Sequence, residues 1–193
     1  MASEPVARIA IDPETIGHLL KDCRLKVPIH QRSYAWEDEH VTDLFQDLTK
    51  ALKDGEPEYF LGSIVLIKAE DASLEVNDGQ QRLATSVILL AAIRDYFHNL
   101  GDKTTSDLVE RELLVSIDRK SHELIPKLQL NVDDNEFFVK RILRLPNDKE
   151  RESAQPSKES HKKIEMAARL AAKHIRNLVA PLREEDRPDQ LHR

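Results

Sequence analysis

The spacing of apolar and polar residues in the N-terminal part of the chain predicts two helices separated by a short strand. Asp12-Pro13 is typical of an N-cap followed by a first helical turn, and the apolar face behind it reaches Lys21. Residues 25–29 predict a brief strand, which Pro28 places at a sheet edge or a strand end. Apolar residues then recur at helical spacing over residues 37–52, which predicts a second helix ended by a glycine.

The middle of the chain predicts two strands and a buried helix. Residues 60–67 and 74–76 are rich in apolar and β-branched residues, and a turn separates them. Gly62 lies within the first strand, where a glycine marks either a β-bulge or the close approach of a ligand or another backbone segment. Residues 83–100 are apolar on nearly all sides until Arg94-Asp95, which predicts the central helix of the fold.

The second half of the chain predicts mostly helices. In chain order, the predicted segments are a helix over 105–117 with Leu108, Leu113, Leu114 and Ile117 inward, a strand over 126–132, a helix with Phe137, Phe138, Ile142 and Leu143, a charged loop over 147–160, and an amphipathic helix over 164–178. Asp133-Asp134-Asn135 is explained more simply as a helix cap than as a set of cation ligands. The tail from Arg183 is too polar to pack.

The order helix, strand, helix, strand, strand, helix predicts an α+β fold, in which helices pack a small mixed sheet and further helical segments follow. We expect a core over residues 1–103 and a mainly helical extension over residues 104–193, with a short strand near residues 127–132. The sequence shows no internal repeat.

The segment Asn77-Asp78-Gly79-Gln80-Gln81-Arg82 occupies the predicted strand-to-helix corner. Asp78-Gly79 supplies a tight turn, since glycine tolerates positive φ, and the next amides stay free at a helix N-terminus, where the dipole favours an anion. Arg82 adds a cation whose planar fork suits phosphate oxygens. The segment therefore predicts either a phosphate site or an ordinary Asn-Asp-Gly hairpin turn beside a solvated arginine.

Composition and charge narrow the function classes. The chain has 193 residues, of which 40% are hydrophobic and 33% charged, as in ordinary soluble domains. Its longest apolar run is too short for a membrane span and its N-terminus lacks signal-peptide features, so we expect a cytoplasmic location and no membrane partner. The net charge of −6 argues against a free-standing, non-specific nucleic-acid binder, and the basic clusters place any DNA contact in the second half.

Several common catalytic motifs are absent from the sequence. It contains no P-loop, no Gly-x-Gly-x-x-Gly fingerprint, no serine nucleophile elbow and no histidine pair at metal-binding spacing. The single Cys23 excludes an internal disulfide and a cysteine-based zinc site. No cluster of ligands that would hold a nuclease metal is recognisable, so nuclease activity is not expected from this chain alone.

Three segments, residues 27–36, 59–65 and 76–85, resemble in order and spacing the N-terminal domain of the GmrSD family of modification-dependent restriction endonucleases, a domain also present in SspE-type phage-defence proteins. The match is strong over residues 13–100, and residues 127–138 also look family-like. Departures are small: Asn77 replaces a usually aliphatic residue, and Ala84 stands where threonine is frequent.

The resemblance implies a ParB/sulfiredoxin-like core, with a nucleotide or phosphate bound at the turn formed by residues 78–82. It further implies Mg²⁺-dependent binding and hydrolysis of a nucleoside triphosphate (GTP, ATP, CTP or UTP), coupled to sensing modified phage DNA. An HNH-type nuclease, present as a C-terminal domain beyond the helical extension or as a separate subunit, would then cut the DNA. The alternative is a non-catalytic DNA- or protein-binding adaptor with the same fold.

We assign roles to residues on this basis. The expected catalytic residues are Asp78, Gln80, Gln81 and Arg82. Arg82 and the neighbouring amides hold the triphosphate, Asp78 either positions Mg²⁺ or fixes the loop, and one of the two glutamines orients the attacking water. The expected phosphate-pocket residues are Gly79, Arg82, Gln31, Arg32, Gly62 and Thr85.

The loop before the second helix has an alternative role in sensing DNA. Gln31 and Arg32 have hydrogen-bonding groups that suit base edges or phosphates, and Tyr34 or Trp36 can stack on a flipped or altered base. The competing explanation for both aromatic residues is a hydrophobic staple before the helix. Acidic helices and a basic distal helix also allow a homodimer.

Overall fold

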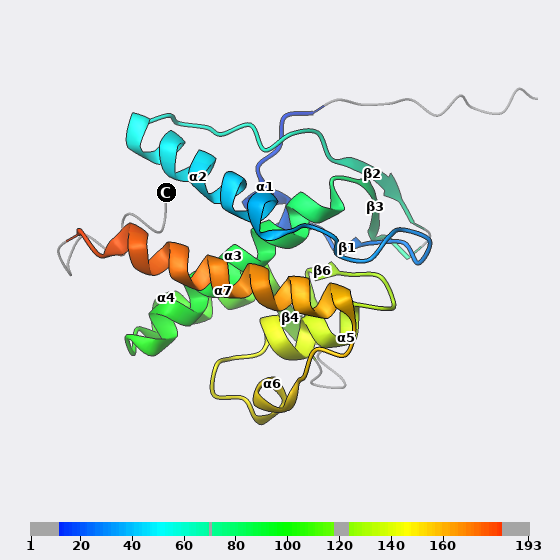
Figure 1. Ribbon diagram of the computed structural model, residues 1–193. Helices are drawn as coiled ribbons and strands as arrows, with labels where there is room; N and C mark the ends of the chain where they lie inside the picture. Colours follow the sequence, from blue (N-terminus) through cyan, green and yellow to red (C-terminus); the bar gives the residue numbers. More distant parts are fainter. Residues whose placement is uncertain (1–11, 70, 118–123, 183–193) are drawn as a thin grey trace, which may run out of the picture.

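The computed structural model describes residues 12–69, 71–117 and 124–182 (Figure 1). The helices are α1 (Ile16–Asp22), α2 (Asp38–Asp54), α3 (Gln80–Asn99), α4 (Lys103–Val109), α5 (Asn135–Phe138), α6 (Lys149–Ser153) and α7 (Glu159–Val179), with π-helical turns η1 (Glu110–Leu114) and η2 (Val139–Leu143). The strands are β1 (Leu25–Lys26), β2 (Val65–Lys68), β3 (Leu74–Asp78), β4 (Val115–Ile117), β5 (Leu124–Pro126) and β6 (Leu128–Gln129). The predicted α+β class and the order of the first six elements are confirmed.

The main sheet has four strands in the order β2-β3-β1-β6 and is mixed, as the sequence predicts. The strand β1 runs parallel to both neighbours, so that Leu25 pairs with Leu74 on one side and Leu128 on the other. The strand β2 is antiparallel to β3, and its register shifts between Val65 and Leu66. Because β1 and β6 are parallel, the segments that follow them leave from the same edge of the sheet.

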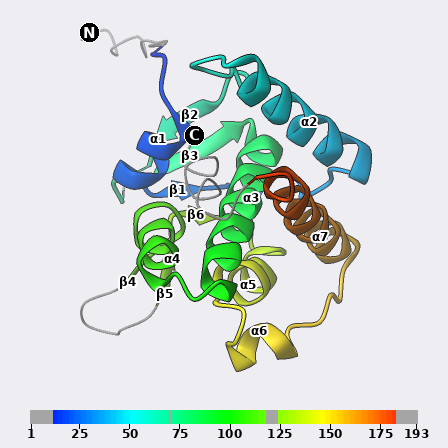
Figure 2. The same ribbon diagram turned by 90° about the vertical axis from the view of Figure 1, so that its left-hand side faces the viewer.

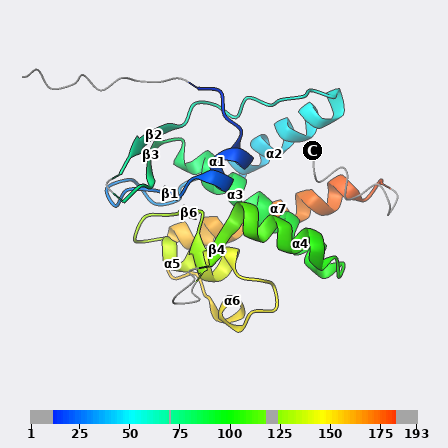
Figure 3. The ribbon, with the colours of Figure 1, turned by 180° about the vertical axis from the view of Figure 1, so that it is seen from behind.

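The helix α3 is the centre of the molecule. Figure 2 shows it between α4 on one side and α7 on the other, and α2 packs beside α7. The main sheet lies at the N-terminal end of α3, where β3 leads into the helix (Figure 3). The buried core runs from Leu20 in α1 to Ala171 in α7, and the second half of the chain contributes β6 to the main sheet. The division of the chain after residue 103 stays a prediction.

Two expected element starts differ from the structure. The first helix begins at Ile16. Its N-cap is Thr15 and not Asp12, because the Thr15 hydroxyl accepts a hydrogen bond from the His18 amide. The strand expected over residues 60–67 covers only β2, because carbonyl groups of the preceding segment accept hydrogen bonds from an arginine side chain of α3. The second predicted helix is confirmed, and Gly55 ends it with a φ of 71°.

The prediction of one helix over residues 105–117 was wrong. The segment splits into α4, η1 and the strand β4, which pairs with β5. The inward placement of Leu108 and Ile117 was therefore also wrong, since 49% and 56% of these side chains are exposed. The strand expected over 126–132 divides into β5 and β6, and the loop expected over 147–160 contains α6. The expectation for the tail from Arg183 lies outside the described residues.

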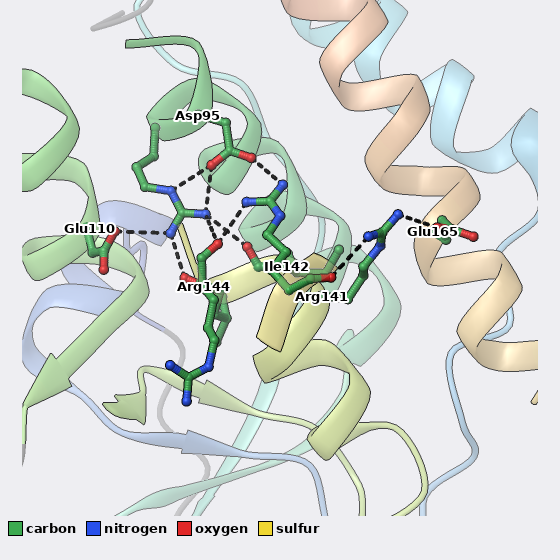
Figure 4. Close-up of polar contacts among 9 residues, drawn as sticks. Asp95, Glu110, Arg141, Ile142, Arg144 and Glu165 are labelled. Carbon is green, nitrogen blue, oxygen red and sulfur yellow. Dashed lines mark hydrogen bonds and ion pairs between the residues drawn. The ribbon is translucent and has the colours of Figure 1, made fainter. Parts of the chain in front are cut away.

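A buried arginine joins α3 to the second half of the chain (Figure 4). Arg94 is fully buried, and its guanidinium donates hydrogen bonds to the carbonyls of Ile142, Leu143 and Arg144 at distances of 3.0, 2.6 and 3.0 Å. These carbonyls lie at the end of η2, where helical carbonyls lack intrahelical partners. The same guanidinium pairs with Asp95 at 2.8 Å and with Glu110, the first residue of η1, at 3.2 Å.

Candidate functional site

The predicted strand-to-helix corner is present at Gly79, which is the N-cap of α3 with a φ of 85°. A Cβ atom at this position would lie 3.0 Å from the Ile64 Cγ1 atom and 3.3 Å from the Ser63 carbonyl oxygen, so both backbone conformation and space require glycine. No side chain caps α3. The first amides of the helix therefore have no intrahelical partner and are available to an anion. A helix and not a second strand follows, so the hairpin alternative was wrong.

The Arg82 side chain folds back onto the segment before β2. Its Nη1 donates to the Leu61 carbonyl at 3.2 Å and its Nη2 to the Ser63 carbonyl at 2.9 Å. A Cβ atom on Gly62, whose φ is 109°, would lie only 1.7 Å from the Arg82 Nη1 atom. The close approach that a glycine here indicates is thus made by Arg82 itself. Asp78, 70% exposed, lies 3.7 Å from the same guanidinium.

The two adjacent glutamines differ in how far the chain satisfies them. The Gln81 Oε1 atom accepts a hydrogen bond from the Ala35 amide at 2.8 Å, and its Nε2 donates to the Ser33 carbonyl at 3.3 Å. The Gln80 Nε2 donates to the Arg32 carbonyl at 3.3 Å. The Gln80 Oε1 atom, however, is buried and has no hydrogen-bond partner among the described residues. Within the described part of the chain, the Gln80 oxygen therefore has no partner, whereas the Gln81 oxygen has one.

The loop after β1 lies against this corner through further hydrogen bonds. The Gln31 Nε2 donates to the Asn77 carbonyl at 3.0 Å, and the Gln31 carbonyl accepts from the Asn131 side chain at 3.1 Å. The Asn131 side chain also contacts the Ser33 hydroxyl at 3.3 Å. The Arg32 side chain is exposed. The structure thus brings Gln31 and Arg32 to the N-terminal end of α3, and their role in binding phosphate or DNA stays a prediction.

Two of the expected contact residues lie in the core. Tyr34 is 4% exposed, and its hydroxyl is 2.7 Å from the Thr85 hydroxyl, which is fully buried and donates to the Gln81 carbonyl. Burial raises the pKa of the Tyr34 phenol far above its ordinary value. Neither the stacking of Tyr34 on a base nor a phosphate contact by Thr85 fits this arrangement. Trp36 is partly buried against the core and stacks on His40, with 5.9 Å between ring centroids, which fits the packing explanation.

A small hollow opens between the loop after β1 and the start of α3. It encloses about 210 Å³, including space open to solvent. Its lining residues are Val27, Arg32, Tyr34, Gln80, Gln81, Ala84, Leu130, Asn131 and Asp134. Only about 10 Å³ of this space is a true cavity, which is room for about one ordered water molecule. A phosphate group at the start of α3 would therefore lie outside the hollow, with a water molecule inside it.

Asp134 is a residue of this hollow that sequence reasoning placed only as a helix cap. Although it is the N-cap of α5, its carboxylate makes no capping bond. Instead its Oδ2 accepts from the Tyr34 amide at 2.7 Å and its Oδ1 from the Ser160 hydroxyl at 2.5 Å. The carboxylate, 1% exposed, thus ties the loop after β1 to the start of α7. No sequence signal links residues so far apart.

The described part of the chain contains no group of three or more His, Cys, Asp or Glu side chains able to hold a metal ion. None of its helices is long and apolar enough to cross a membrane. Cys23 is free and partly buried.

The fold and the corner at Gly79 define an α+β domain with an uncapped, buried helix N-terminus suited to an anion. A family model for the N-terminal domain of the GmrSD restriction endonuclease matches residues 16–189, and the chain belongs to this family. The match continues through the second half, beyond the region of strongest resemblance. No curated protein matches the chain. Membership supports involvement in modification-dependent restriction, with DNA and a nuclease as the partners that the family implies.

Proposed function

We propose that this chain binds and hydrolyses a nucleoside triphosphate and couples this reaction to sensing modified phage DNA within a restriction system. An HNH-type nuclease domain or subunit would act on the DNA. One observation carries the proposal: the free Oε1 atom of Gln80 is buried beside the uncapped N-terminus of α3 and lines the hollow. A buried acceptor without a partner is unfavourable, and a ligand or water with a donor group would satisfy it.

Phosphoryl transfer to water needs charge neutralisation and an oriented nucleophile more than covalent chemistry from the protein. The amides at the start of α3 and the helix dipole would hold phosphate oxygens. Arg32, exposed at the rim of the hollow, would add positive charge. The Gln80 Oε1 atom would accept a hydrogen bond from the attacking water, whereas the Gln81 Oε1 atom already accepts one from the Ala35 amide.

The arrangement of carboxylates fits Mg²⁺ only as an ion shared with substrate. Mg²⁺ in nucleotide sites is usually held by one or two carboxylates together with substrate phosphates. Asp78 is an exposed carboxylate at the corner and would be the protein ligand. Bound there, Mg²⁺ would neutralise charge on the phosphates.

Release of inorganic phosphate tests this proposal. The assay uses GTP, ATP, CTP and UTP separately with Mg²⁺, with and without modified phage DNA. The variant Gln80→Leu should lower turnover by about 100-fold while nucleotide affinity changes only a few-fold, since a water-orienting contact acts on the chemical step. The matched control Gln46→Leu changes an exposed glutamine of α2 and should leave turnover unchanged.

Two results would contradict the proposal. One is the absence of phosphate release from every nucleotide under both DNA conditions. The other is a Gln80→Leu protein that turns over like the wild type. Arg82→Ala is less decisive, because it also releases the Leu61 and Ser63 carbonyls.

A second candidate function is a non-catalytic DNA- or protein-binding adaptor. It is favoured by the engagement of both Arg82 and Gln81 with backbone groups of this chain, where they brace the fold. An adaptor would bind nucleotide in a titration without releasing phosphate. The two measurements on the same sample therefore separate the two functions.

A further inference from the structure

Most basic residues of the second half are neutralised by carboxylates within the chain. The pairs are Lys140 with Glu136 at 2.6 Å, Arg141 with Glu165 at 2.6 Å, Arg144 with Asp148 at 3.1 Å and Glu150 at 3.0 Å, Lys158 with Asp133 at 2.5 Å, Lys162 with Glu159 at 3.1 Å, and Lys163 with Glu37 at 2.6 Å. The clusters that the sequence offers for DNA contact are therefore mostly occupied.

Three basic side chains of α7 are different. Arg169, Lys173 and Arg176 are exposed, and no carboxylate pairs with any of them within the described ranges. Their spacing of four and three residues places them on one face of the helix. Seven residues at about 1.5 Å per residue span about 10 Å, close to the rise of three nucleotides at about 3.4 Å each along one DNA strand.

This face is turned away from the packed sides of α7. Ile164, Ala171 and Ile175 are buried in the helix interface. His174 contacts α2, where its ring lies 5.0 Å from the Phe45 ring. In Figure 1, α7 crosses the molecule in front of α3, on the side that faces the viewer. The helix carries a net formal charge of +3, five Lys and Arg against two Glu, in a chain whose net charge is −6.

We propose that the outer face of α7, formed by Arg169, Lys173 and Arg176, binds the phosphate backbone of duplex DNA. The proposal rests on the proposed role of the chain in sensing DNA and adds the surface that makes the contact. Charge complementarity carries it: three cations with no carboxylate partner among the described residues lie on one rigid helix and match a row of phosphates. Such contacts position a protein on DNA without reading its sequence. The contact therefore needs no modification in the DNA, and the sensing step lies elsewhere.

The test is a titration of the full chain with a short, unmodified, fluorescently labelled DNA duplex at several salt concentrations, without nucleotide. The variant is Arg169→Gln/Lys173→Gln/Arg176→Gln, since glutamine preserves helix propensity. Each lost phosphate contact lowers the slope of log K against log salt by about 0.9, so the slope should flatten by about 2.7. Between about 50 and 200 mM salt, the wild type should then lose about 40-fold more affinity than the variant.

A matched control removes the same charge elsewhere. The variant Lys50→Gln/Lys53→Gln/Arg111→Gln also lowers the net charge by three, on exposed positions of α2 and η1, and should keep the wild-type slope. The single variant Arg169→Gln, expected to flatten the slope by about 0.9, serves if the triple variant does not fold. Circular dichroism checks folding.

Three outcomes overturn the proposal. The first is an unchanged salt slope in the α7 variant, and the second is an equal flattening of the slope in the control. The third is a variant that loses self-association and keeps DNA binding, which would assign the face to an acidic surface of a second copy. Because the titration contains no nucleotide, failure of phosphate release leaves its result intact. The two proposals therefore fail separately.

Discussion

Replacing Arg94 with methionine tests whether one buried guanidinium holds the two halves of the chain together. Methionine fills a similar volume but donates no hydrogen bonds. The change leaves the end of η2 without its donor and two acidic side chains, Asp95 and Glu110, without their buried partner. These carboxylates are 18% and 17% exposed, so water reaches them only in part.

The expected loss of unfolding free energy is about 4 kcal/mol. Removing one partner of a buried ion pair typically costs about 3–5 kcal/mol, and each unsatisfied buried carbonyl about 1–3 kcal/mol. Arg151 offsets part of this, because it still donates to Asp95 and to the Arg144 carbonyl. A loss of about 4 kcal/mol is a large fraction of the roughly 5–15 kcal/mol by which domains are stable. Arg94→Lys should lose about 2–3 kcal/mol, since an ammonium lacks the planar fork.

Urea unfolding followed by circular dichroism measures this quantity, with an unchanged m-value as the condition for comparing midpoints. The control is Arg111→Met, which changes an exposed arginine whose only ion pair within the described residues is 3.9 Å long, and its effect should stay within about 0.5 kcal/mol. A loss of less than about 1 kcal/mol for Arg94→Met would show that the network contributes little beyond what hydration or repacking replaces.

Three further predictions concern the candidate site and its surroundings. Gln81→Leu should lower the free energy of unfolding by about 2–4 kcal/mol, because the Ala35 amide and the Ser33 carbonyl lose their partners. Gln80→Leu should lower it by about 1 kcal/mol or less. Equal losses for the two variants in urea unfolding would contradict this prediction. Gly62→Ala should destabilise by at least about 2 kcal/mol, since its φ is positive and its Cβ would displace the guanidinium beside it; a wild-type melting curve would refute this. Burial lowers the pKa of His174, so its contribution to stability should be full above the unfolded histidine pKa and decline as the pH falls through the folded pKa. A His174→Gln protein should lack this decline. A wild-type protein that is equally stable above and below these pKa values would contradict the prediction.

The regular parts of the fold were accessible from the sequence because local signals and burial agree there. The helix over residues 37–52 has a strong apolar stripe and a glycine terminator, and the structure places Val41, Leu44 and Phe45 inward. The helix over 83–100 is apolar almost all round and is the buried centre. Consistency between local pattern and tertiary packing is what makes such elements predictable.

The errors fall where long-range contacts override the local pattern. Ile117 continues the helical spacing of Leu113 and Leu114, yet it lies in a strand because β5 offers it a partner. The segment before β2 reads as strand, but its carbonyls bond to Arg82 and not to a neighbouring strand. Arg94-Asp95 was visible only as an interruption of an apolar run. In each case the deciding partner lies seven or more residues away in sequence.

At the candidate site, too, the roles of the residues depend on long-range contacts that the sequence does not reveal. Gln80 and Gln81 are chemically identical and adjacent, so the sequence predicts only that one of them orients a water molecule. Successive helical residues point about 100° apart, and a loop that packs on one of them need not satisfy the other. Here the Gln81 side chain donates to the Ser33 carbonyl and accepts from the Ala35 amide. The Gln80 amide nitrogen donates to the Arg32 carbonyl, while its oxygen has no partner among the described residues. The loop after β1, which leaves the same edge of the sheet as the end of β3, therefore decides which glutamine braces the fold and which keeps an oxygen without a partner among the described residues.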